Sequence, residues 1–253
     1  MVGWMRTAAL AIVPLLIWEL LSRFGPWPRW LLPGPAAVAG SVSAMLADGR
    51  LPHAAVRSLA RLAQGYGLSA AIGVPLGVLM ARSPGVNSAL RPAVLGLQAL
   101  PSICWLPLAI LWFGLSESAI LFVVVMGSLL AIAIATEDAI AGVDPVLLRA
   151  AGTLGIRRLR FVAGVLLPAA LPGVLTGLKL GWSFAWRALM AGELLFVAGG
   201  LGQLLQAGRE VLDAAQVMGV MAAIVAIGVA VDRVLFRVLE LRVRRRWGLL
   251  EAA

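Results

Sequence analysis

Residues 118–136 read SAILFVVVMGSLLAIAIAT, and residues 137–164 continue as EDAIAGVDPVLLRAAGTLGIRRLRFVAG. The first stretch has no charged side chain and is about as long as a helix that crosses the hydrocarbon core of a bilayer. In the second stretch, Asp144 followed by Pro145 is typical of a helix start, with a capping carboxylate and a proline at the first helical position. Gly155 is well placed to end that helix. The two stretches predict a membrane span followed by a helix of about ten residues, which is too short to cross the membrane.

The composition places the whole chain in a membrane. Of its 253 residues, 61% are apolar and 13% are charged, and the mean hydropathy is +0.97. Soluble domains are about 45–50% apolar and about 25% charged, so a water-soluble globule is excluded. A charged residue at the centre of a spanning helix costs about 2.5–3.5 kcal/mol, so windows without charge mark the spans. Besides 118–136, these windows are 62–81, 92–116, 161–178 and 214–231.

A sixth span is expected ahead of these five, at residues 7–21. Glu19 interrupts this stretch, but no small-x-small cleavage site of a signal peptide follows it, and Trp27 and Trp30 suit a membrane interface. We therefore expect an all-α integral membrane protein with six transmembrane helices. Six crossings use about 120 residues, which leaves no room for two soluble domains. The expected division is a first helix with an extracytoplasmic amphipathic segment (1–55), a core of five helices (56–240) and a basic cytoplasmic tail (241–253).

The arginines predict the orientation. With the N-terminus inside, twelve arginines fall on the cytoplasmic side and six fall outside. Because cytoplasmic loops carry the excess of positive charge, both termini are expected in the cytoplasm. The net charge of +9 is then orientation charge near the lipid bilayer. No nucleic acid partner is expected, since no basic stretch is interleaved with an aromatic platform.

Residue counts exclude several kinds of site. The single cysteine, Cys104, and the single histidine, His53, cannot form a disulfide framework or a Cys/His metal cluster. The single lysine, Lys179, lies in TGLKLG, so the chain has no GxxxxGK phosphate loop. A membrane enzyme needs clustered acids or histidines, and only Glu137 and Asp138 are adjacent. An enzyme is therefore the remote alternative, and no catalytic residue, metal or bound cofactor is expected.

The short helix expected at 144–154 offers an apolar strip. Its members recur at helical spacing: Leu147, Ala150, Ala151 and Leu154. Arg149 lies to one side. Small alanines let another backbone come close, so the strip suits the groove of a partner protein. The alternatives are a helix lying in the lipid interface and an ion channel, which would not need this helix.

One pattern around this helix resembles a known family. RAAGTLG at 149–155, nine further residues and VLLP at 165–168 resemble the cytoplasmic signature of bacterial ATP-binding-cassette importer permeases, E-A-A-x-x-x-G-x9-I-x-L-P. Arg149 stands where this EAA motif has glutamate, which reverses one charge at the contact with the ATPase. Further segments resemble permeases for aliphatic sulfonates, taurine and nitrate: LLPGPAAV (31–38), GVPLGVLMARS (73–83), LQALPSICWLPLAILWFGLSES (97–118) and LLPAALPGVLTGLKL (166–180).

The resemblance implies a type I importer permease with a MetI-like bundle in a bacterial inner membrane. Its partners would be a second permease subunit, expected to be identical, two ATPase subunits that bind ATP and magnesium, and an extracytoplasmic substrate-binding protein. The cargo would be a small oxyanion, first of all an aliphatic sulfonate. Taurine, nitrate, bicarbonate, a thiamine precursor and an aromatic acid are the alternatives. The coupling helix would contact the ATPase through Asp144, Leu147, Arg149, Ala150, Ala151, Leu154 and Gly155.

The fifth span has two different faces. On a helix that turns about 100° per residue, one face is polar and aromatic and carries Lys179, Trp182, Ser183 and Trp186. The opposite face carries a glycine ladder that favours close helix packing: Gly173, Gly177 and Gly181.

Two cations lie in this span. Lys179 and Arg187, about 12 Å apart along the axis, are candidates for lining an anion route. The alternatives are snorkelling of Lys179 to the inner interface and pairing of Arg187 with Glu193 or another acid. In the third span, Gln98 and Ser102 are further candidates for the route, as are Cys104 and Trp105. Polar residues there also serve as helix–helix hydrogen bonds, and Cys104 as a small buried apolar residue.

Overall fold

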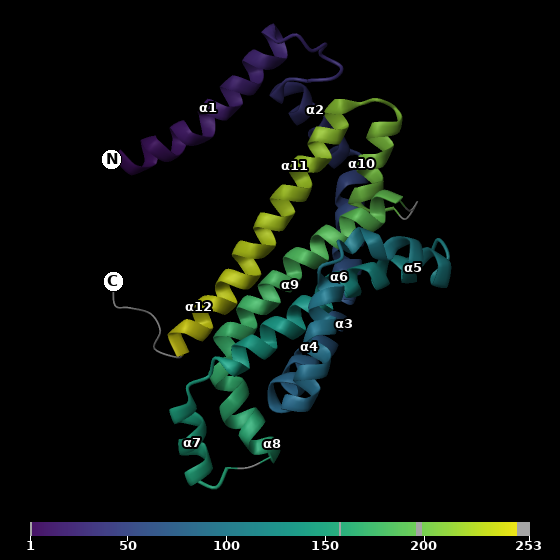
Figure 1. Cartoon of the computed structure of the whole chain (residues 1–253). Coiled ribbons are helices and arrows are strands. Elements are labelled where there is room, and N and C mark those ends of the chain that lie inside the picture. Colours follow the sequence, from purple (N-terminus) through teal and green to yellow (C-terminus); the bar gives the residue numbers. More distant parts are fainter. Residues whose placement is uncertain (1, 157, 196–198, 247–253) are drawn as a thin grey trace. The chain divides into compact units, whose positions relative to one another are not determined.

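The structure is a computed structural model that describes residues 2–156, 158–195 and 199–246. All regular secondary structure in these residues is helical (Figure 1). The chain divides into two compact units. Unit 1 consists of Met1–Ser58 and Glu193–Ile227, and unit 2 of Leu59–Gly192 and Gly228–Ala253. The expected division into 1–55, 56–240 and 241–253 stays a prediction, and residues 247–253 of the expected tail lie outside the described residues.

The helices include a 3₁₀ turn (η1) and two π-helical turns (η2 and η3). In chain order they are α1 (Val2–Phe24), α2 (Pro35–Ala47), α3 (Arg50–Arg82), α4 (Pro84–Gln98), η1 (Ser102–Trp105), α5 (Leu106–Phe113), α6 (Glu117–Ala141), α7 (Pro145–Thr153), α8 (Arg158–Phe161), η2 (Val162–Leu166), α9 (Leu167–Leu195), α10 (Leu201–Glu210), α11 (Ala214–Val231), η3 (Asp232–Phe236) and α12 (Arg237–Arg246).

Four helical stretches of the described residues are long and apolar enough to cross a membrane. They are Arg50–Arg82, Glu117–Ala141, Val162–Leu195 and Ala214–Val243. Each coincides with one of the windows that the absence of charge marked as a span. The second, fourth, fifth and sixth predicted spans are therefore confirmed as helices of sufficient length.

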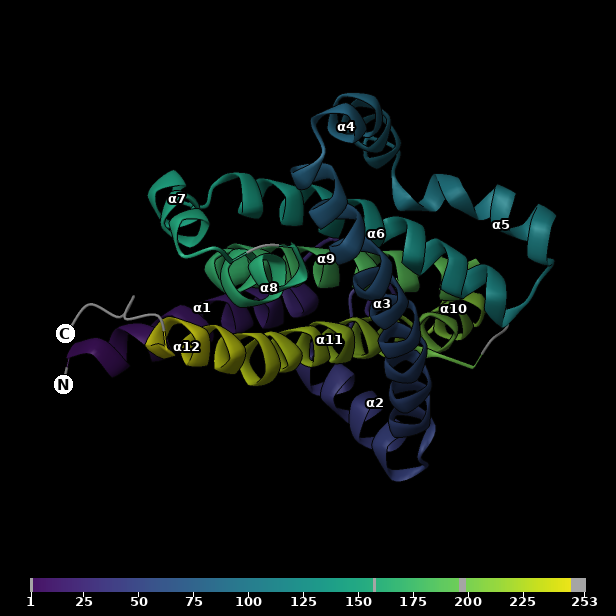
Figure 2. The same cartoon turned by 90° about the horizontal axis from the view of Figure 1, so that it is seen from below.

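The third predicted span, 92–116, is not one continuous helix. The chain instead forms Pro84–Gln98 and Ser102–Phe113, bent by 98° from each other. Pro101 explains the break, because proline lacks the N–H that continues a helix and disfavours the helical conformation of the residue before it. As one broken span, this pair raises the number of candidate spans to five. Figure 2 shows α4 and α5 leading away from the bend on one side of α6.

The predicted first span falls in α1. This helix has 23 residues, about 35 Å at about 1.5 Å per residue. The side chains of residues 1–11 lie outside the described part, so the sixth crossing stays a prediction. Trp18 Nε1 donates a hydrogen bond to the Pro33 carbonyl at 3.0 Å, which ties α1 to the start of α2. With 13 residues, α2 is too short to span the bilayer.

Helix α6 is the centre of unit 2, with side chains such as Ile120 and Ile132 fully buried. The glycine ladder of α9 faces it. Cβ atoms added at Gly173, Gly177 and Gly181 would lie 2.7, 2.5 and 2.4 Å from the nearest α6 side-chain atoms. Real Cβ contacts are essentially never this short, so any larger residue would push the two helices apart. The predicted packing role of the ladder is confirmed.

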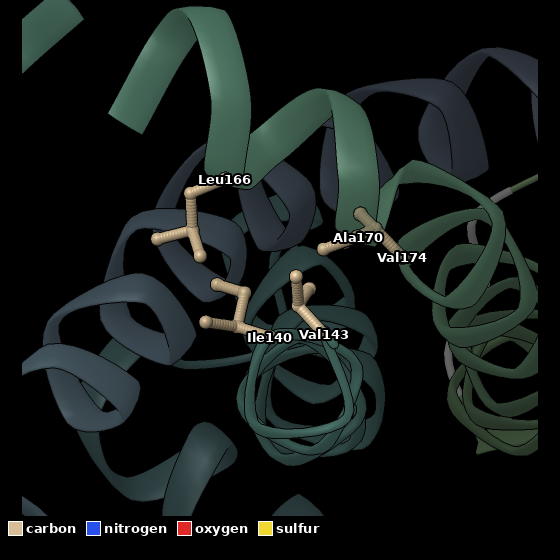
Figure 3. Close-up of a cluster of buried hydrophobic side chains, with 5 residues drawn as sticks. All are labelled: Ile140, Val143, Leu166, Ala170 and Val174. Atoms are coloured by element: carbon tan, nitrogen blue, oxygen red, sulfur yellow. The ribbon is translucent and has the colours of Figure 1, made fainter. Parts of the chain in front are cut away.

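An apolar cluster joins the end of α6 to the beginning of the next span (Figure 3). It consists of Ile140, Val143, Leu166, Ala170 and Val174. Leu148 of α7 packs against this cluster. The short helix is therefore attached to unit 2 through its inward face.

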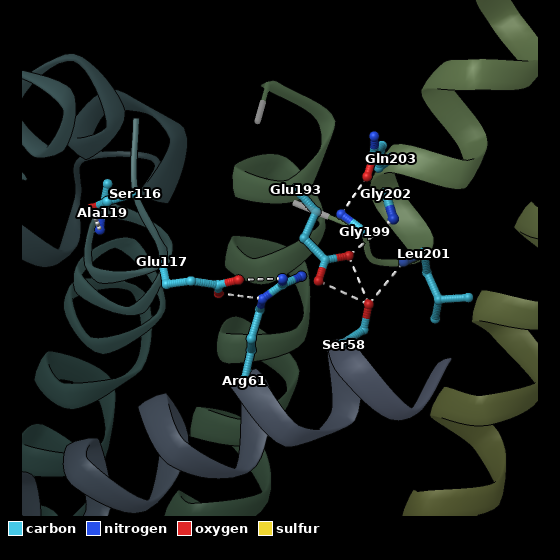
Figure 4. A network of polar contacts seen from close by, with 10 residues as sticks. All are labelled: Ser58, Arg61, Ser116, Glu117, Ala119, Glu193, Gly199, Leu201, Gly202 and Gln203. Carbon is cyan, nitrogen blue, oxygen red and sulfur yellow. Dashed lines mark hydrogen bonds and ion pairs between the residues drawn. The ribbon is translucent and has the colours of Figure 1, made fainter. Parts of the chain in front are cut away.

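In unit 1, a buried carboxylate organises the beginning of α10 (Figure 4). Glu193 accepts hydrogen bonds from Ser58 Oγ at 2.7 Å and from the Gly202 N–H at 3.0 Å. Ser58 Oγ in turn accepts the Leu201 N–H at 2.8 Å. A helix N-terminus has free N–H groups and a positive dipole end, so it stabilises a negative charge. The charge of Glu193 is therefore satisfied within unit 1.

Candidate functional site

The break between α4 and η1 borders a cavity of about 260 Å³ in unit 2. Three of the residues predicted to line a route, Gln98, Ser102 and Arg187, meet in its wall although they come from distant parts of the sequence. Irregular backbone at membrane depth is tolerated where it is buried in protein or lines a cavity. Broken helices also build solute sites in other membrane transport proteins. This cavity is therefore the candidate functional site.

Arg187 is the only charged residue in the described lining of this cavity. Its Nε donates to the Ser183 carbonyl at 3.2 Å, and its guanidinium carbon lies 4.7 Å from the centre of the Phe184 ring. These two contacts fix the plane of the guanidinium. Within the described residues its two terminal nitrogens have no hydrogen-bond or ion-pair partner. A planar fork of free N–H donors is suited to binding a sulfonate or another oxyanion through two oxygens.

Gln98 also lines this cavity, although its amide oxygen Oε1 has almost no accessible surface. Its Oε1 is buried and accepts no hydrogen bond from the described residues. An unsatisfied buried acceptor costs about 1–3 kcal/mol. Ser102, in the first turn of η1, is half-buried and adds a hydroxyl group to the wall. The cavity thus offers a cation, an amide and a hydroxyl in an otherwise apolar lining.

Another part of the wall lies where α6 packs closely against α9 and η1. A Cβ added at Gly127, near the middle of α6, would lie 2.8 Å from the Ala188 Cβ and 3.3 Å from the Ser102 Cβ. A larger residue at this position would displace α9 or η1. Gly127 therefore sets the position of Ser102 and of the α9 turn that carries Arg187.

Lys179 lies outside the cavity and has an acidic partner. Its Nζ is 2.8 Å from Asp232 Oδ1, and both side chains are half-exposed. Asp232 opens the π-helical turn η3. Asp232 thus balances the charge of Lys179, while the predicted role of Lys179 in lining a route stays a prediction.

Aromatic rings surround this ion pair. The Trp182 ring packs edge-on against Tyr66, with ring centres 5.3 Å apart, and at a tilt against Phe236, with ring centres 5.8 Å apart. The Tyr66 hydroxyl donates to the Leu178 carbonyl at 2.9 Å. The residues Tyr66, Lys179, Trp182, Asp232 and Phe236, here named the Lys179 cluster, join three helical segments of unit 2. This arrangement is typical of helix packing.

The remaining residues of the predicted face have local contacts. Ser183 is exposed and donates to the Lys179 carbonyl at 3.3 Å. Trp186 lies close to Gly228, where an added Cβ would be 3.6 Å from its Nε1. Cys104 is exposed, so its interpretation as a buried apolar residue is wrong. Trp105 belongs to an aromatic group around Phe122, with ring centres 6.3 Å apart.

The predicted short helix is present as α7. Asp144 caps it by accepting the Val146 N–H at 2.7 Å, Pro145 occupies the first turn, and Gly155 follows the end with φ of 71°. The residues of the predicted apolar strip differ in their exposure. Ala151 is buried against unit 2, whereas Leu147 and Leu154 are exposed.

The exposed face of α7 is apolar with one charge beside it. Val146 and Leu154 expose 59% and 76% of their surface, large fractions for apolar residues outside a lipid phase. Ala150 and Arg149 are exposed as well. An exposed apolar strip on a short capped helix requires a cover, either another protein or lipid.

Two ion pairs of unit 2 were not predicted. Arg61 binds Glu117 through both carboxylate oxygens, at 2.5 and 2.6 Å, beside the Ser116 cap of α6 (Figure 4). Arg91 pairs with Glu137 and Asp138 at the other end of α6. In the sequence, charges next to a span boundary indicate only the orientation of the chain, because no spacing shows which helix supplies an ion-pair partner.

A second cavity, of about 510 Å³, lies in unit 1 and includes His53 in its lining. Asp48 and Arg50 also line it. Hydrogen bonds from the backbone N–H and the side chain of Arg50 lower the pKa of the Asp48 carboxyl. The cation here is thus already paired, in contrast to Arg187. In the described residues, no group of three or more His, Cys, Asp or Glu side chains could hold a metal ion.

Comparison with known proteins shows the family to which the chain belongs. Residues 73–247 match the family described as binding-protein-dependent transport system inner membrane component. The putative aliphatic sulfonates transport permease of Bacillus subtilis is 30% identical, over 82% of this chain and 75% of the relative. The taurine transport system permease of Escherichia coli is 30% identical, over 95% of this chain and 82% of the relative. An inward-facing structure of the MetNI methionine ABC transporter has a TM-score of 0.64 and 22% identity, covers 75% of this chain and 92% of that chain, and supports the fold alone.

Proposed function

The chain belongs to the family of binding-protein-dependent transport system inner membrane components and is a permease subunit of an ATP-binding-cassette importer, and from this premise we propose that it imports a small oxyanion, namely an aliphatic sulfonate. The alternatives of the same architecture are taurine, nitrate, bicarbonate, a thiamine precursor and an aromatic acid. The subunit itself makes and breaks no covalent bond. It holds two conformations whose balance is shifted by ATP and by the loaded binding protein.

The observation that carries the substrate proposal is the unpaired Arg187 in the cavity at the helix break. A cation within a span is costly unless a partner or solute balances it. Its stacking on Phe184 and its bond to the Ser183 carbonyl hold the fork ready for an oxyanion. The sulfonate and taurine permeases among the relatives support the same class of solute.

The proposed assembly has two identical permeases, two ATPase subunits and an extracytoplasmic binding protein. ATP and magnesium would bind to the ATPase subunits. The subunit would lie in the bacterial inner membrane with both termini in the cytoplasm, as the excess of arginine on that side favours. Solute would pass by alternating access, as closure of the ATPase dimer turns the paired permeases from inward-facing to outward-facing.

We assign α7 as the coupling helix in this assembly. Its exposed strip would fill a groove of the ATPase, while Leu148 and Ala151 transmit the movement to unit 2 through their inward contacts. Arg149, which replaces the glutamate of the motif, would face a contact of reversed charge. The ATPase partner is therefore expected to present an acidic group near this position.

Transport is the direct test of the proposed function. The permease is reconstituted in liposomes with its ATPase and binding protein, and uptake of ethanesulfonate and taurine is measured with and without ATP. ATP-dependent uptake of a sulfonate, together with stimulation of ATPase activity by the loaded binding protein, is expected. Uptake of neither sulfonate, or ATPase activity indifferent to the binding protein, would contradict the proposal.

Docking of α7 has a separate test with a matched control. Replacing Leu147 and Leu154 by glutamate places two charges on the exposed strip and is expected to reduce co-purification of the ATPase at least tenfold. Gly152→Ser is the control, because Gly152 is exposed on the other side of the helix and has open space around it. Undiminished co-purification with the double variant would show that the strip lies on lipid.

A further inference from the structure

We infer that Arg233 and Arg237 bind the headgroups of anionic phospholipids in the surrounding leaflet. The inference goes beyond the proposed function and does not depend on the solute. It concerns a surface that lies wholly in unit 2 and outside the Arg187 cavity. The ligand is a phospholipid whose headgroup carries a net negative charge, such as phosphatidylglycerol.

Exposed residues recur in pairs about every four positions where the last helical stretch runs from α11 through η3 into α12 (Figure 1). Residues three or four apart in a helix lie on the same face, so the pairs form one continuous surface, here named the arginine stripe. Apart from Leu235, the residues between the pairs are less exposed. The first pair is apolar, and each later pair joins an arginine to an apolar side chain: Val229 with Ala230, Arg233 with Val234, Arg237 with Val238, and Leu241 with Arg242.

The apolar members of the arginine stripe favour a lipid environment. Val234 exposes 72% of its surface, and Val238 and Leu241 expose 39% and 38%. Acyl chains cover such side chains on the outside of a membrane span. An arginine beside them can lay its apolar stem along the same surface and extend its guanidinium to the headgroups. The alternation of valine and arginine therefore fits the boundary between acyl chains and phosphates.

The length of the helical stretch places the arginines at this boundary. Ala214–Val243 has 30 residues, about 45 Å at about 1.5 Å per residue, whereas the hydrocarbon core is about 30 Å thick. Counted from Ala214, about 20 residues cross the core, so Arg233 lies at its far edge and Arg237 about one turn beyond. The headgroup layer on each side is about 5–7 Å thick. Both guanidinium groups can therefore reach lipid phosphates.

Both arginines are available to an anion. Arg233 and Arg237 are exposed, and neither has a hydrogen-bond, ion-pair or ring partner among the described residues. The acids nearby are engaged, since Asp232 pairs with Lys179 and Glu240 also has a partner. Guanidinium groups bind phosphate oxygens through two donors. The phosphate of a zwitterionic lipid is already balanced by its own ammonium group, so the stripe should prefer an anionic lipid.

The test is binding of phosphatidylglycerol and of phosphatidylcholine to the full-length permease in detergent, with dissociation constants measured by native mass spectrometry. Arg233→Gln with Arg237→Gln removes both charges, and Arg233→Lys with Arg237→Lys keeps the charges without the planar fork. The matched control is Arg29→Gln with Arg209→Gln, which removes the same net charge from two exposed arginines of unit 1. Thermal unfolding of each variant shows whether it folds.

The wild type and the control are expected to bind phosphatidylglycerol at least tenfold more tightly than phosphatidylcholine. The double glutamine variant should bring this ratio close to one, a loss of about fivefold (about 1 kcal/mol) for each arginine. Each single glutamine variant should lose about fivefold, which keeps the test valid if the double variant does not fold. The lysine variant should keep most of the ratio, because the attraction is mainly one of net charge.

Equal binding of the two lipids by the wild type, or an unchanged ratio in the glutamine variants, would overturn the inference. An equal loss in the control would also overturn it, because the preference would then follow the net charge of the chain and not this surface. If the stripe contacts a second permease or the ATPase instead, the glutamine variant would keep its lipid ratio and lose co-purification of that partner.

Discussion

The Lys179 cluster and the Arg187 cavity occupy two parts of one helix, yet the two cations have different surroundings. Lys179 is paired with Asp232 at 2.8 Å and lies next to the Trp182 ring system. Arg187 is exposed, has no acidic partner in the described residues and lines a cavity beside a broken helix. From the sequence alone, both cations are candidates for lining an anion route. The contrast shows that neighbouring helices decide whether a charge in a span holds the bundle together or remains available to a solute.

The difference has an energetic basis. An ion pair between helices removes the cost of two lone charges in the membrane and adds an interhelical contact. A lone arginine keeps its cost unless water or a solute balances it.

The largest expected effect is that of breaking the Lys179 pair. Asp232→Ala leaves the lysine without a partner within a span, at a cost of about 2.5–3.5 kcal/mol on insertion scales. We expect a lower yield of folded protein and a clearly lower midpoint of thermal unfolding in detergent. The double variant Lys179→Met with Asp232→Leu removes both charges and should recover most of the loss. Equal stability of Asp232→Ala and the double variant would contradict a pairing role.

The second-largest effect is expected from removing the charge of Arg187 in the cavity. Arg187→Gln removes the cation from the cavity and is expected to reduce sulfonate uptake by about tenfold to a hundredfold, the range for one hydrogen bond to a charged group. Arg187→Lys should restore uptake only in part, because lysine lacks the planar fork.

Arg82→Gln is the matched control for Arg187, since Arg82 also lies over an aromatic ring, that of Phe161, but outside the cavity. It should leave uptake near that of the wild type. The thermal unfolding midpoint of Arg187→Gln should stay close to the wild-type value. A loss of folding as large as that of Asp232→Ala would assign Arg187 a structural role instead.

The smallest effect concerns one hydrogen bond of the Lys179 cluster. Tyr66→Phe keeps the ring against Trp182 but removes the donor to the Leu178 carbonyl, at a cost of about 1 kcal/mol. For a chain of this size we expect the unfolding midpoint to fall by about 2–4 °C with sulfonate uptake preserved. An uptake defect without a stability change would place Tyr66 on the solute route.

Particular residues show how far sequence reasoning reached. The charge-free windows located four spans, because the cost of charge in lipid is a local property of the chain. The caps at Asp144 and Gly155 located α7, because helix ends depend on neighbouring residues. The break at Pro101 was missed, although the proline was visible, because several other prolines, such as Pro75 and Pro172, lie inside continuous helices of this chain.

The residues of the candidate site were predicted from the sequence, but which of them lie together was not. Gln98, Ser102 and Arg187 were named with Lys179, Trp182 and Ser183 as one route, and the structure brings only the first three to one cavity. The partners Asp232, Tyr66 and Phe236 were not foreseen. Helical spacing gives the face of one helix, whereas the identity of the residues opposite depends on how other helices pack.

The sequence by itself determined that this chain lies in a membrane, which windows are apolar enough to cross it, where the short capped helix stands and which family it resembles, because these properties depend on local hydropathy, capping and motif spacing. Only the tertiary structure decided that Lys179 is neutralised, that Arg187 is available, and that the chain breaks beside it to leave a cavity. These outcomes depend on the glycine-mediated approach of α9 to α6 and on the groups that distant helices present at short range. Electrostatic and hydrogen-bond partners act over a few ångströms of space, and no periodicity along the chain records them.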